Sequence, residues 1–286
     1  MTPSDGSSGE LSLRAPLLIA AFEGWNDAGD AATDAVEHLV DVWDGEEVAA
    51  IDPDEFYDFQ VNRPMVSLED GLTRKITWPT SRFYAVRMPS GERDLVLVRG
   101  VEPNMRWRGF CDEILRMAAE LGVAEVVTLG ALLADSPHTR PVPVSGTSSD
   151  PALAERLGLE RSRYEGPTGI VGVLQEACST AGLAAVSFWA AVPHYVASPP
   201  CPKATIALLH RVEDLLDVPI PLGDLPEEAR AWEHNVDELA AEDSDVAEYI
   251  ASLEEREPEE ELPEASGEAI AAEFQRFLRR QGGGDG

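Results

Sequence analysis

The most informative stretch of this sequence is LLIAAFEGWND, which runs from Leu17 to Asp27. Its first six residues are all apolar, a run typical of a strand that is buried on both faces of a sheet. From Asp27 to Trp43, apolar residues recur at spacings of three and four, which indicates a helix. A buried strand that leads directly into a helix is the repeating unit of a parallel sheet.

The chain repeats this alternation outward from that stretch. We expect further strands at 47–51, 95–98, 123–129 and 183–192, and further helices at 104–121, 168–181 and 198–216. Residues 52–90 interrupt the pattern and are interpreted as an excursion that contains a hairpin, and residues 137–150 as a loop rich in Pro, Ser and Gly. The sequence therefore predicts an α/β protein: a three-layer α/β/α body with a mostly parallel sheet.

Charge divides the chain into parts. The 286 residues include 22 Lys and Arg and 53 Asp and Glu, for a net charge of −31. Residues 224–268 hold 18 acidic and two basic residues, a net of −16 and about half of the total. We therefore expect a disordered N-terminus (1–12), a body (13–222), an acidic helical C-terminal appendage (223–281) and a flexible tail (282–286).

The appendage carries its own helical pattern. Nine positions from Leu225 to Leu253 alternate steps of four and three, as in a heptad seam. Asp243 and Ser244 offer a cap for a second helix, so one rod and a helical hairpin both fit. We favour packing on the chain's own body over a coiled coil with another chain, because few heptads are present. A short amphipathic helix is expected over 270–278.

Composition excludes several classes of protein. Nucleic-acid and anionic membrane binding depend on cationic side chains, which a net charge of −31 disfavours. The longest nearly apolar stretch, 183–192, is too short to span a bilayer, and no secretory signal begins the sequence. Cys111, Cys178 and Cys201 are isolated and match neither a disulfide framework nor a zinc site. We therefore expect a cytoplasmic protein.

Known catalytic signatures are missing. Gly29-Asp30-Ala31 stands where a phosphate-binding loop requires Gly-Lys-Ser/Thr, and neither HExxH nor GxSxG occurs. We therefore assign no catalytic residue, no metal ligand and no cofactor.

Polar residues gather where the predicted strands end. In a parallel sheet these ends lie along one edge, where α/β proteins bind ligands. One interpretation is a functional site, in which these residues carry out acid–base chemistry or hold an anion. The other is structural, in which they join loops or subunits. Both interpretations stay open. We name them the strand-end residues, and the binding candidates among them are Glu23, Trp25, Asn26, Asp27, Asn104, Arg106, His138, Arg140 and His194, with Glu102, Asp135 and Tyr195 beside them.

The same loops resemble the proteasome assembly chaperone 2 (PAC2) family in its actinobacterial form, over residues 13–222. The motifs that carry the resemblance are AFEGWNDAGDAA (21–32), EPNMRWRGF (102–110), LGALLADSPHTRPVPVSGT (129–147), YEGPTGIVGVL (164–174) and WAAVPHYV (189–196). The resemblance implies a phosphorylase/hydrolase-like fold, homo-oligomers and no established catalytic residues. Eukaryotic and archaeal relatives assist assembly of the 20S proteasome α ring. Several dock through a C-terminal hydrophobic-Tyr-X motif, which the final QGGGDG does not match.

Two functional hypotheses follow. The first is an oligomeric assembly chaperone or protein-interaction module without catalysis, with proteasome subunits and further copies of itself as partners. The resemblance suggests a trimer, and Trp25 and Trp107 are candidates for exposed interface aromatics. The alternative is a protein that binds a nucleoside or an anionic ligand, or a hydrolase/phosphorylase-like enzyme, in which Arg106 and Arg140 hold an anion and His138, His194 or Asp27 moves a proton.

Overall fold

The structure is a computed structural model that describes residues 12–89, 93–148, 150–159, 164–196 and 198–255. Its elements alternate between strands and helices along the body and end in helices. In chain order they are β1 (Leu17–Glu23), η1 (Ala28–Asp30), α1 (Ala31–Val42), β2 (Glu46–Ala50), η2 (Pro53–Glu55), β3 (Met65–Glu69), β4 (Thr73–Thr77), β5 (Ser81–Val86), β6 (Leu95–Val101), α2 (Trp107–Glu120), β7 (Glu125–Ala134), β8 (Val144–Ser148), α3 (Pro151–Leu157), α4 (Ile170–Thr180), β9 (Ala184–Pro193), α5 (Pro202–Leu216), α6 (Leu225–Glu242) and α7 (Ser244–Glu254).

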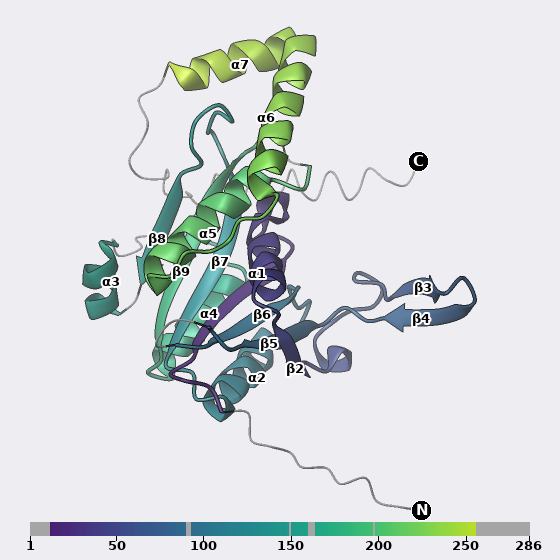
Figure 1. Cartoon of the computed structure of the whole chain (residues 1–286), viewed down its shortest axis with the longest axis vertical. Coiled ribbons are helices and arrows are strands. Elements are labelled where there is room, and N and C mark those ends of the chain that lie inside the picture. Colours follow the sequence, from purple (N-terminus) through teal and green to yellow (C-terminus); the bar gives the residue numbers. More distant parts are fainter. Residues whose placement is uncertain (1–11, 90–92, 149, 160–163, 197, 256–286) are drawn as a thin grey trace, which may run out of the picture.

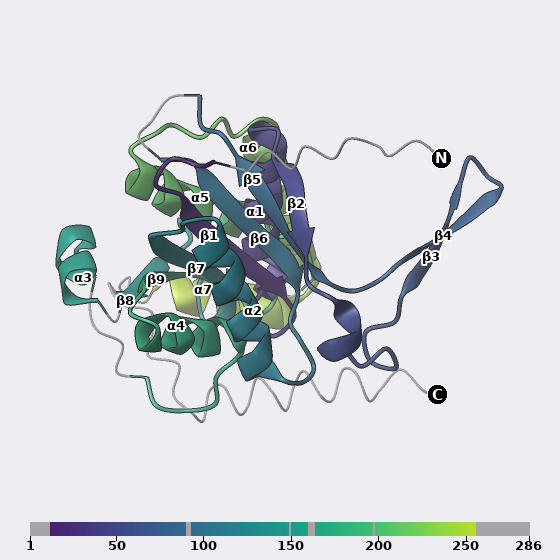
Figure 2. The same ribbon diagram turned by 90° about the horizontal axis from the view of Figure 1, so that it is seen from below.

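Seven strands form one sheet in the order β2-β5-β6-β1-β7-β9-β8. The four central strands β6, β1, β7 and β9 run parallel, and β2, β5 and β8 are antiparallel to their neighbours at the two sides. Helices cover both faces, with α1 and α5 on one and α2 and α4 on the other (Figure 2). The three-layer α/β/α prediction is therefore confirmed.

The first strand shows why the chain folds in layers. Alternate residues of a strand point to opposite faces. Leu17, Ile19 and Ala21 of β1 face one buried cluster together with α1 and α5. Leu18, Ala20 and Phe22 face the other, which includes Phe110 of α2 and Leu174 of α4. A strand that is apolar at every position buries side chains in two cores at once.

The acidic end of the chain forms two helices. Asp243 separates α6 from α7 and accepts hydrogen bonds from the backbone N–H of Asp245 and Val246, at 3.0 and 3.4 Å. The hairpin alternative is thus the one that the structure adopts. Helix α6 packs against α5, and Trp232 reaches the body's core, so the appendage packs on its own chain (Figure 1).

Several sequence predictions were wrong in detail. The loop expected over 137–150 contains β8, and the excursion over 52–90 contains β5 as well as the hairpin of β3 and β4. Helix α3 was not predicted. Helix α2 begins at Trp107 with Arg106 at its N-cap position, and Asn104 Oδ1 accepts from Asp58 instead of capping the helix. Helix α5 begins at Pro202, four residues later than expected. Edge strands such as β8 lack the continuous apolar runs that marked the central strands.

Some predictions lie outside the described residues: the disordered N-terminus apart from Ser12, the helix over 270–278 and the tail over 282–286. Within the described ranges, no helix has both the length and the apolar composition needed to cross a bilayer.

Candidate functional site

The strand-end residues follow the carboxyl ends of β1, β6, β7 and β9, which run parallel. The turn after β1 joins its neighbours directly: Asn26 O accepts the Ala131 N–H at 2.8 Å, and Asp27 forms an isolated bridge to Ala131. Strand β7 continues past this point to Ala134. Its loop therefore begins beyond the turn after β1, and the strand-end residues divide into separate clusters.

Glu102 is the centre of the first cluster. Its Oε1 accepts hydrogen bonds from Asn26 Nδ2 and from the backbone N–H of Ile170, both at 2.8 Å. Ile170 begins α4, where a carboxylate complements the positive end of the helix. Burial raises the pKa of Glu102, while these hydrogen bonds oppose the rise. Glu102 thus fastens α4 to the turn after β1.

Asp27 belongs to the same turn but points at the start of α1. Its carboxylate accepts hydrogen bonds from the Ala32 N–H, at 2.6 Å, and from the Thr33 hydroxyl. It therefore satisfies donors in the first turn of α1 from outside the helix, because η1 intervenes and Asp30 occupies the N-cap position. Burial raises its pKa to about 7, with a smaller contribution from repulsion by Asp30. Such a value suits proton transfer, yet the carboxylate is only 4% exposed and faces its own helix.

Glu23 and Trp25 complete the turn. Glu23 lies 3.7 Å from Nη2 of Arg99, which also meets Glu37 at 3.2 Å, so Glu23 belongs to a surface ion-pair group. Trp25 and Trp107 are half-buried, which contradicts the expectation that they are exposed. Trp107 Nε1 donates to the carbonyl oxygen of Pro103 at 2.6 Å.

Asn104 and Arg106 hold the base of the β3–β4 hairpin. Asn104 Oδ1 accepts from the Asp58 N–H at 2.9 Å and from Asn62 Nδ2 at 3.0 Å. Arg106 pairs with Glu55 Oε2 at 2.5 Å and lies over the ring of Phe56. Both residues therefore anchor the excursion.

The second cluster surrounds His138, whose side chain is 2% exposed. Its Nδ1 lies 2.8 Å from the Tyr195 hydroxyl, and its Nε2 lies 2.9 Å from Oδ1 of Asp237 on α6. The carbonyl oxygen of His138 accepts from Lys203 Nζ at 2.5 Å, and Lys203 also pairs with Glu233 of α6. The loop after β7 is therefore clamped to the appendage.

The residues near His138 also contact the appendage. Arg140 donates to the carbonyl oxygen of Glu254 on α7, and the Thr139 hydroxyl donates to the carboxylate of the same residue. His194 lies 3.3 Å from Asp135 and packs edge-on against Tyr249 of α7, with ring centroids 5.2 Å apart. Acidic and aromatic side chains of α6 and α7 thus cover this part of the strand-end residues.

Sequence reasoning missed the residues from the appendage and Lys203. For the appendage, the signal was the set of acidic positions beside the heptad seam, which we had paired with no residue of the body. Arg106 and Arg140, the two proposed anion ligands, contact Glu55 and Glu254 in different clusters.

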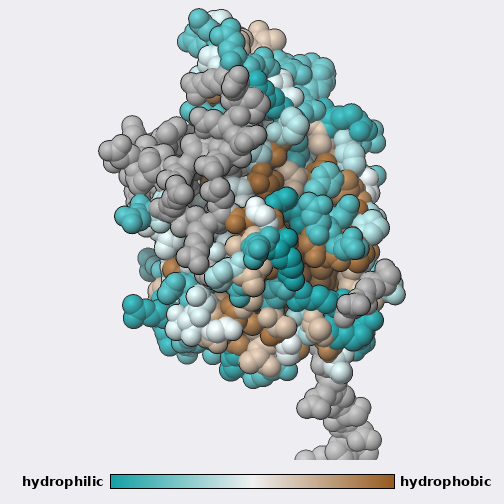
Figure 3. Space-filling view, turned by 90° about the vertical axis from the view of Figure 1, so that its left-hand side faces the viewer, coloured by the Kyte–Doolittle hydropathy of each residue, from teal (hydrophilic) through white to brown (hydrophobic). Residues whose placement is uncertain are grey.

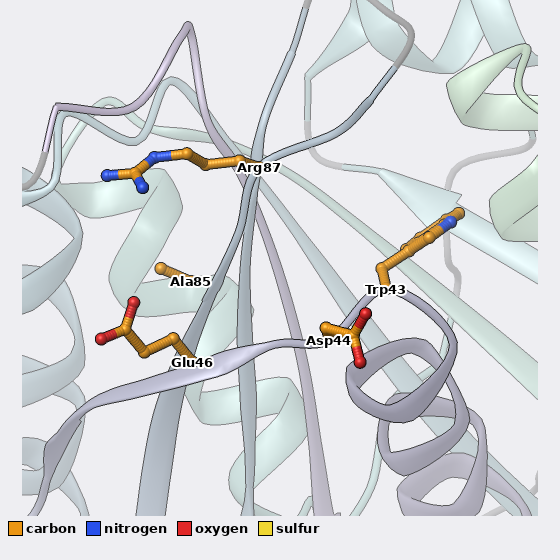
Figure 4. A pocket seen from close by; sticks show the side chains of 5 residues that line it. All are labelled: Trp43, Asp44, Glu46, Ala85 and Arg87. Carbon is orange, nitrogen blue, oxygen red and sulfur yellow. The ribbon is translucent and has the colours of Figure 1, made fainter.

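One shallow cavity, of about 160 Å³, lies at the opposite end of the sheet (Figure 4). Trp43, Asp44, Glu46, Ala85 and Arg87 line it, from the end of α1, the start of β2 and the end of β5. It contains none of the strand-end residues. Within the described residues, no three His, Cys, Asp or Glu side chains gather where they could hold a metal ion.

The body's fold and its loops are matched by known proteins. A model of the PAC2 family matches residues 21–240. The chain belongs to the PAC2 family. The match extends into α6 of this PAC2 chain. The sequence motifs had limited the resemblance to residues 13–222, so the family region is longer than expected at this end. No curated protein matches the chain.

Two solved structures are similar to this PAC2 chain over 82% of its length and 99% of theirs. One is a PAC2 family protein from Streptomyces avermitilis, with 66% identity and a TM-score of 0.77. The other is a proteasome-assembly chaperone homologue from Mycobacterium tuberculosis, with 59% identity and a TM-score of 0.75. PbaA of Pyrococcus furiosus, an archaeal homologue of proteasome-assembly chaperone, shares the fold at 19% identity, with a TM-score of 0.58 over 79% of this chain and 92% of its own.

Proposed function

We propose that this PAC2-family chain is an oligomeric, non-catalytic protein that binds proteasome subunits and assists their assembly. The observation that carries the proposal is the 59% identity with the proteasome-assembly chaperone homologue from Mycobacterium tuberculosis, over nearly that protein's whole length. We also propose that the chain is divided into a body (13–222) and an acidic appendage (223–281). The large negative charge keeps such an assembly soluble.

The geometry of the strand-end residues supports protein binding over the small-molecule alternative. A nucleoside or anion site needs cations and a proton-transfer group that converge on open space. Here Arg106 and Arg140 contact acids in separate clusters, and His138 is enclosed by Tyr195 and Asp237. These contacts are the ones expected of groups that hold loops and helices together.

We place this function in the cytoplasm. Cys111, Cys178 and Cys201 are all free and buried, and burial raises the pKa of each thiol to about 11 or 12. Unpaired thiols are typical of a reducing compartment.

The test is complex formation with purified 20S proteasome α subunits from the same organism, measured by native gel and light scattering. We expect a stoichiometric complex and faster formation of the α ring. An unrelated protein of similar size and negative charge controls for nonspecific attraction. If no complex forms at micromolar concentrations and the rate is unchanged, the assembly role is wrong.

The same preparation tests the alternative. A thermal-shift screen with nucleosides and inorganic phosphate should leave the melting temperature unchanged. A ligand at one hundred times its Kd would add about 2.7 kcal/mol of stability. A shift that Arg140→Ala removes would favour the small-molecule function instead.

A further inference from the structure

Exposed apolar side chains concentrate on one segment, residues 61–78, which we name the hairpin arm. It consists of β3, β4 and their flanks. Among the described residues, nine large apolar side chains are exposed, and seven of them belong to the arm: Val61, Met65, Val66, Leu68, Leu72, Ile76 and Trp78. On the side of β8 and α3, by contrast, hydrophobic and hydrophilic residues are interspersed (Figure 3). Concentrated exposure of this kind marks an interaction surface.

The arm has two different faces. The register pairs Val66 with Ile76 and Leu68 with Arg74, so these side chains share one largely apolar face. The pairs on the opposite face are mostly polar, and there Lys75 forms an ion pair with Glu69 at 2.8 Å. Every residue of β3 and β4 is exposed. A two-stranded ribbon is only marginally stable alone, so its apolar face gains stability by docking.

The base of the arm is fixed to the body. Asn104 Oδ1 accepts hydrogen bonds from Asp58 and Asn62, just before the arm and within it. At the other end of the arm, Trp78 packs edge-on against Phe59, with centroids 4.8 Å apart. The arm projects away from the sheet in both views (Figures 1 and 2). A surface that is already oriented loses less entropy on docking.

Charge indicates what the arm contacts. The arm holds three basic residues and two acidic ones, a net of +1 in a chain of net −31. Helices α6 and α7, over residues 225–254, hold ten acidic residues and one basic, a net of −9. Leu239 of α6 is 61% exposed and lies between Glu238 and Glu242 in the sequence. An apolar residue among acids complements the face of the arm that holds Ile76 and Arg74.

The arm extends from the side of the molecule beside β2 and β5, whereas α6 and α7 of the same chain form its top (Figure 1). We propose that the hairpin arm of one copy docks on α6 of a second copy, with Ile76 packed near Leu239 and Arg74, on the same face of the arm, facing Glu238 and Glu242. Because two different surfaces meet, the contact is head-to-tail, and a closed ring satisfies every copy. This inference rests on the self-association within the proposed function and requires no proteasome subunit.

The first test is the mass of the purified chain by light scattering. We expect an oligomer for the native chain and a monomer for Ile76→Glu and for Leu239→Asp. Thr77→Glu, which places the same charge on the opposite face of the arm, is the matched control and should stay oligomeric. Circular dichroism checks that the variants are folded. A monomeric native chain, or an oligomer that Ile76→Glu does not affect, overturns the proposal.

The second test mixes the two monomeric variants. The Leu239→Asp copy keeps an intact arm and the Ile76→Glu copy keeps an intact α6, so the mixture should form a dimer and nothing larger. Two monomers that stay apart would show that the arm docks elsewhere and would overturn the α6 contact. If the chain forms an oligomer that depends on the arm but binds no proteasome α subunit, the assembly role is wrong and the arm contact still stands. A monomeric native chain whose subunit binding is lost in Ile76→Glu assigns the arm to the proteasome partner instead.

Discussion

The imidazole of His138, in the loop after β7, lies 2.9 Å from the carboxylate of Asp237, which is 99 residues away on α6. The imidazole is almost fully buried, whereas the Asp237 side chain is 63% exposed. This contact joins the strand ends of the body to the acidic appendage. The sequence suggested His138 as a group that moves a proton, whereas in the structure it holds the loop after β7 against α6.

We expect His138→Ala to destabilise the protein by about 1–3 kcal/mol, because it empties a buried position and leaves the Tyr195 hydroxyl without the imidazole. Asp237→Asn should cost less than about 1 kcal/mol, since its side chain is exposed and an amide still bonds the ring. Urea unfolding measures both. Hydrogen exchange in α6 should speed up in His138→Ala, and unchanged exchange there would contradict the clamp.

Gly169 precedes α4 at a point where a side chain does not fit. A Cβ at this position would lie 2.2 Å from Asn26 Nδ2. Gly169→Ala should therefore cost about 1–3 kcal/mol as the buried amide shifts from Glu102. Gly109→Ala is the control, because its Cβ would meet only Phe56 at 3.6 Å inside α2. Alanine favours a helix interior by about 0.5–1 kcal/mol, so the two variants should differ in sign. The melting temperature of each variant distinguishes them, and equal changes would contradict the close packing of Gly169 against Asn26.

Glu102 should tolerate an amide better than truncation. Glu102→Gln keeps an oxygen for Asn26 and Ile170 and removes a charge whose burial is unfavourable, so we expect a change within about 1 kcal/mol. Glu102→Ala leaves two buried donors unpaired and should cost about 2–3 kcal/mol. Urea unfolding compares the two variants. If Glu102→Ala and Glu102→Gln lower the free energy of unfolding equally, Glu102 does not hold α4 to the turn after β1.

Asp27 predicts a dependence of stability on pH. Its pKa is raised from 3.8 to about 7 in the folded chain, so between these values the folded state binds more protons than the unfolded state. The free energy of unfolding should therefore fall as pH rises from about 4 to about 7, by on the order of 2–4 kcal/mol. Asp34, whose pKa burial raises to about 6, contributes with the same sign.

Asp27→Asn removes the titrating group and keeps an oxygen for the Ala32 N–H. Its stability should decline less between pH 4.5 and 8 than that of the native chain, when both are measured by urea unfolding at one protein concentration. Asp44→Asn, on the exposed surface just after the end of α1, is the control and should leave the slope unchanged. If the free energy of unfolding of the native chain rises between pH 4.5 and 8, the raised pKa of Asp27 is wrong.

The central strands and their helices followed from the sequence because they depend on local patterns. Leu17–Phe22 is apolar at each position and is buried at each position. Asp243 was recognised as a cap because a cap acts within a few residues of its helix. Strands β5 and β8 were missed because neither is a continuous apolar run: β5 alternates buried with half-buried positions, and β8, at the edge of the sheet, is half-buried over most of its length.

The strand-end residues show the limit of that reasoning. Parallel strands bring loop residues to one edge whatever the loops contain, so the shared edge was predictable. Whether Arg140 faces a ligand or Glu254, and whether His138 is open or clamped by Asp237, depends on residues about 100 positions away. The sequence alone therefore specifies the layers and the position of each loop. The packing of α6 and α7 on the body specifies which groups are occupied, because contacts between distant residues leave no local periodicity to detect.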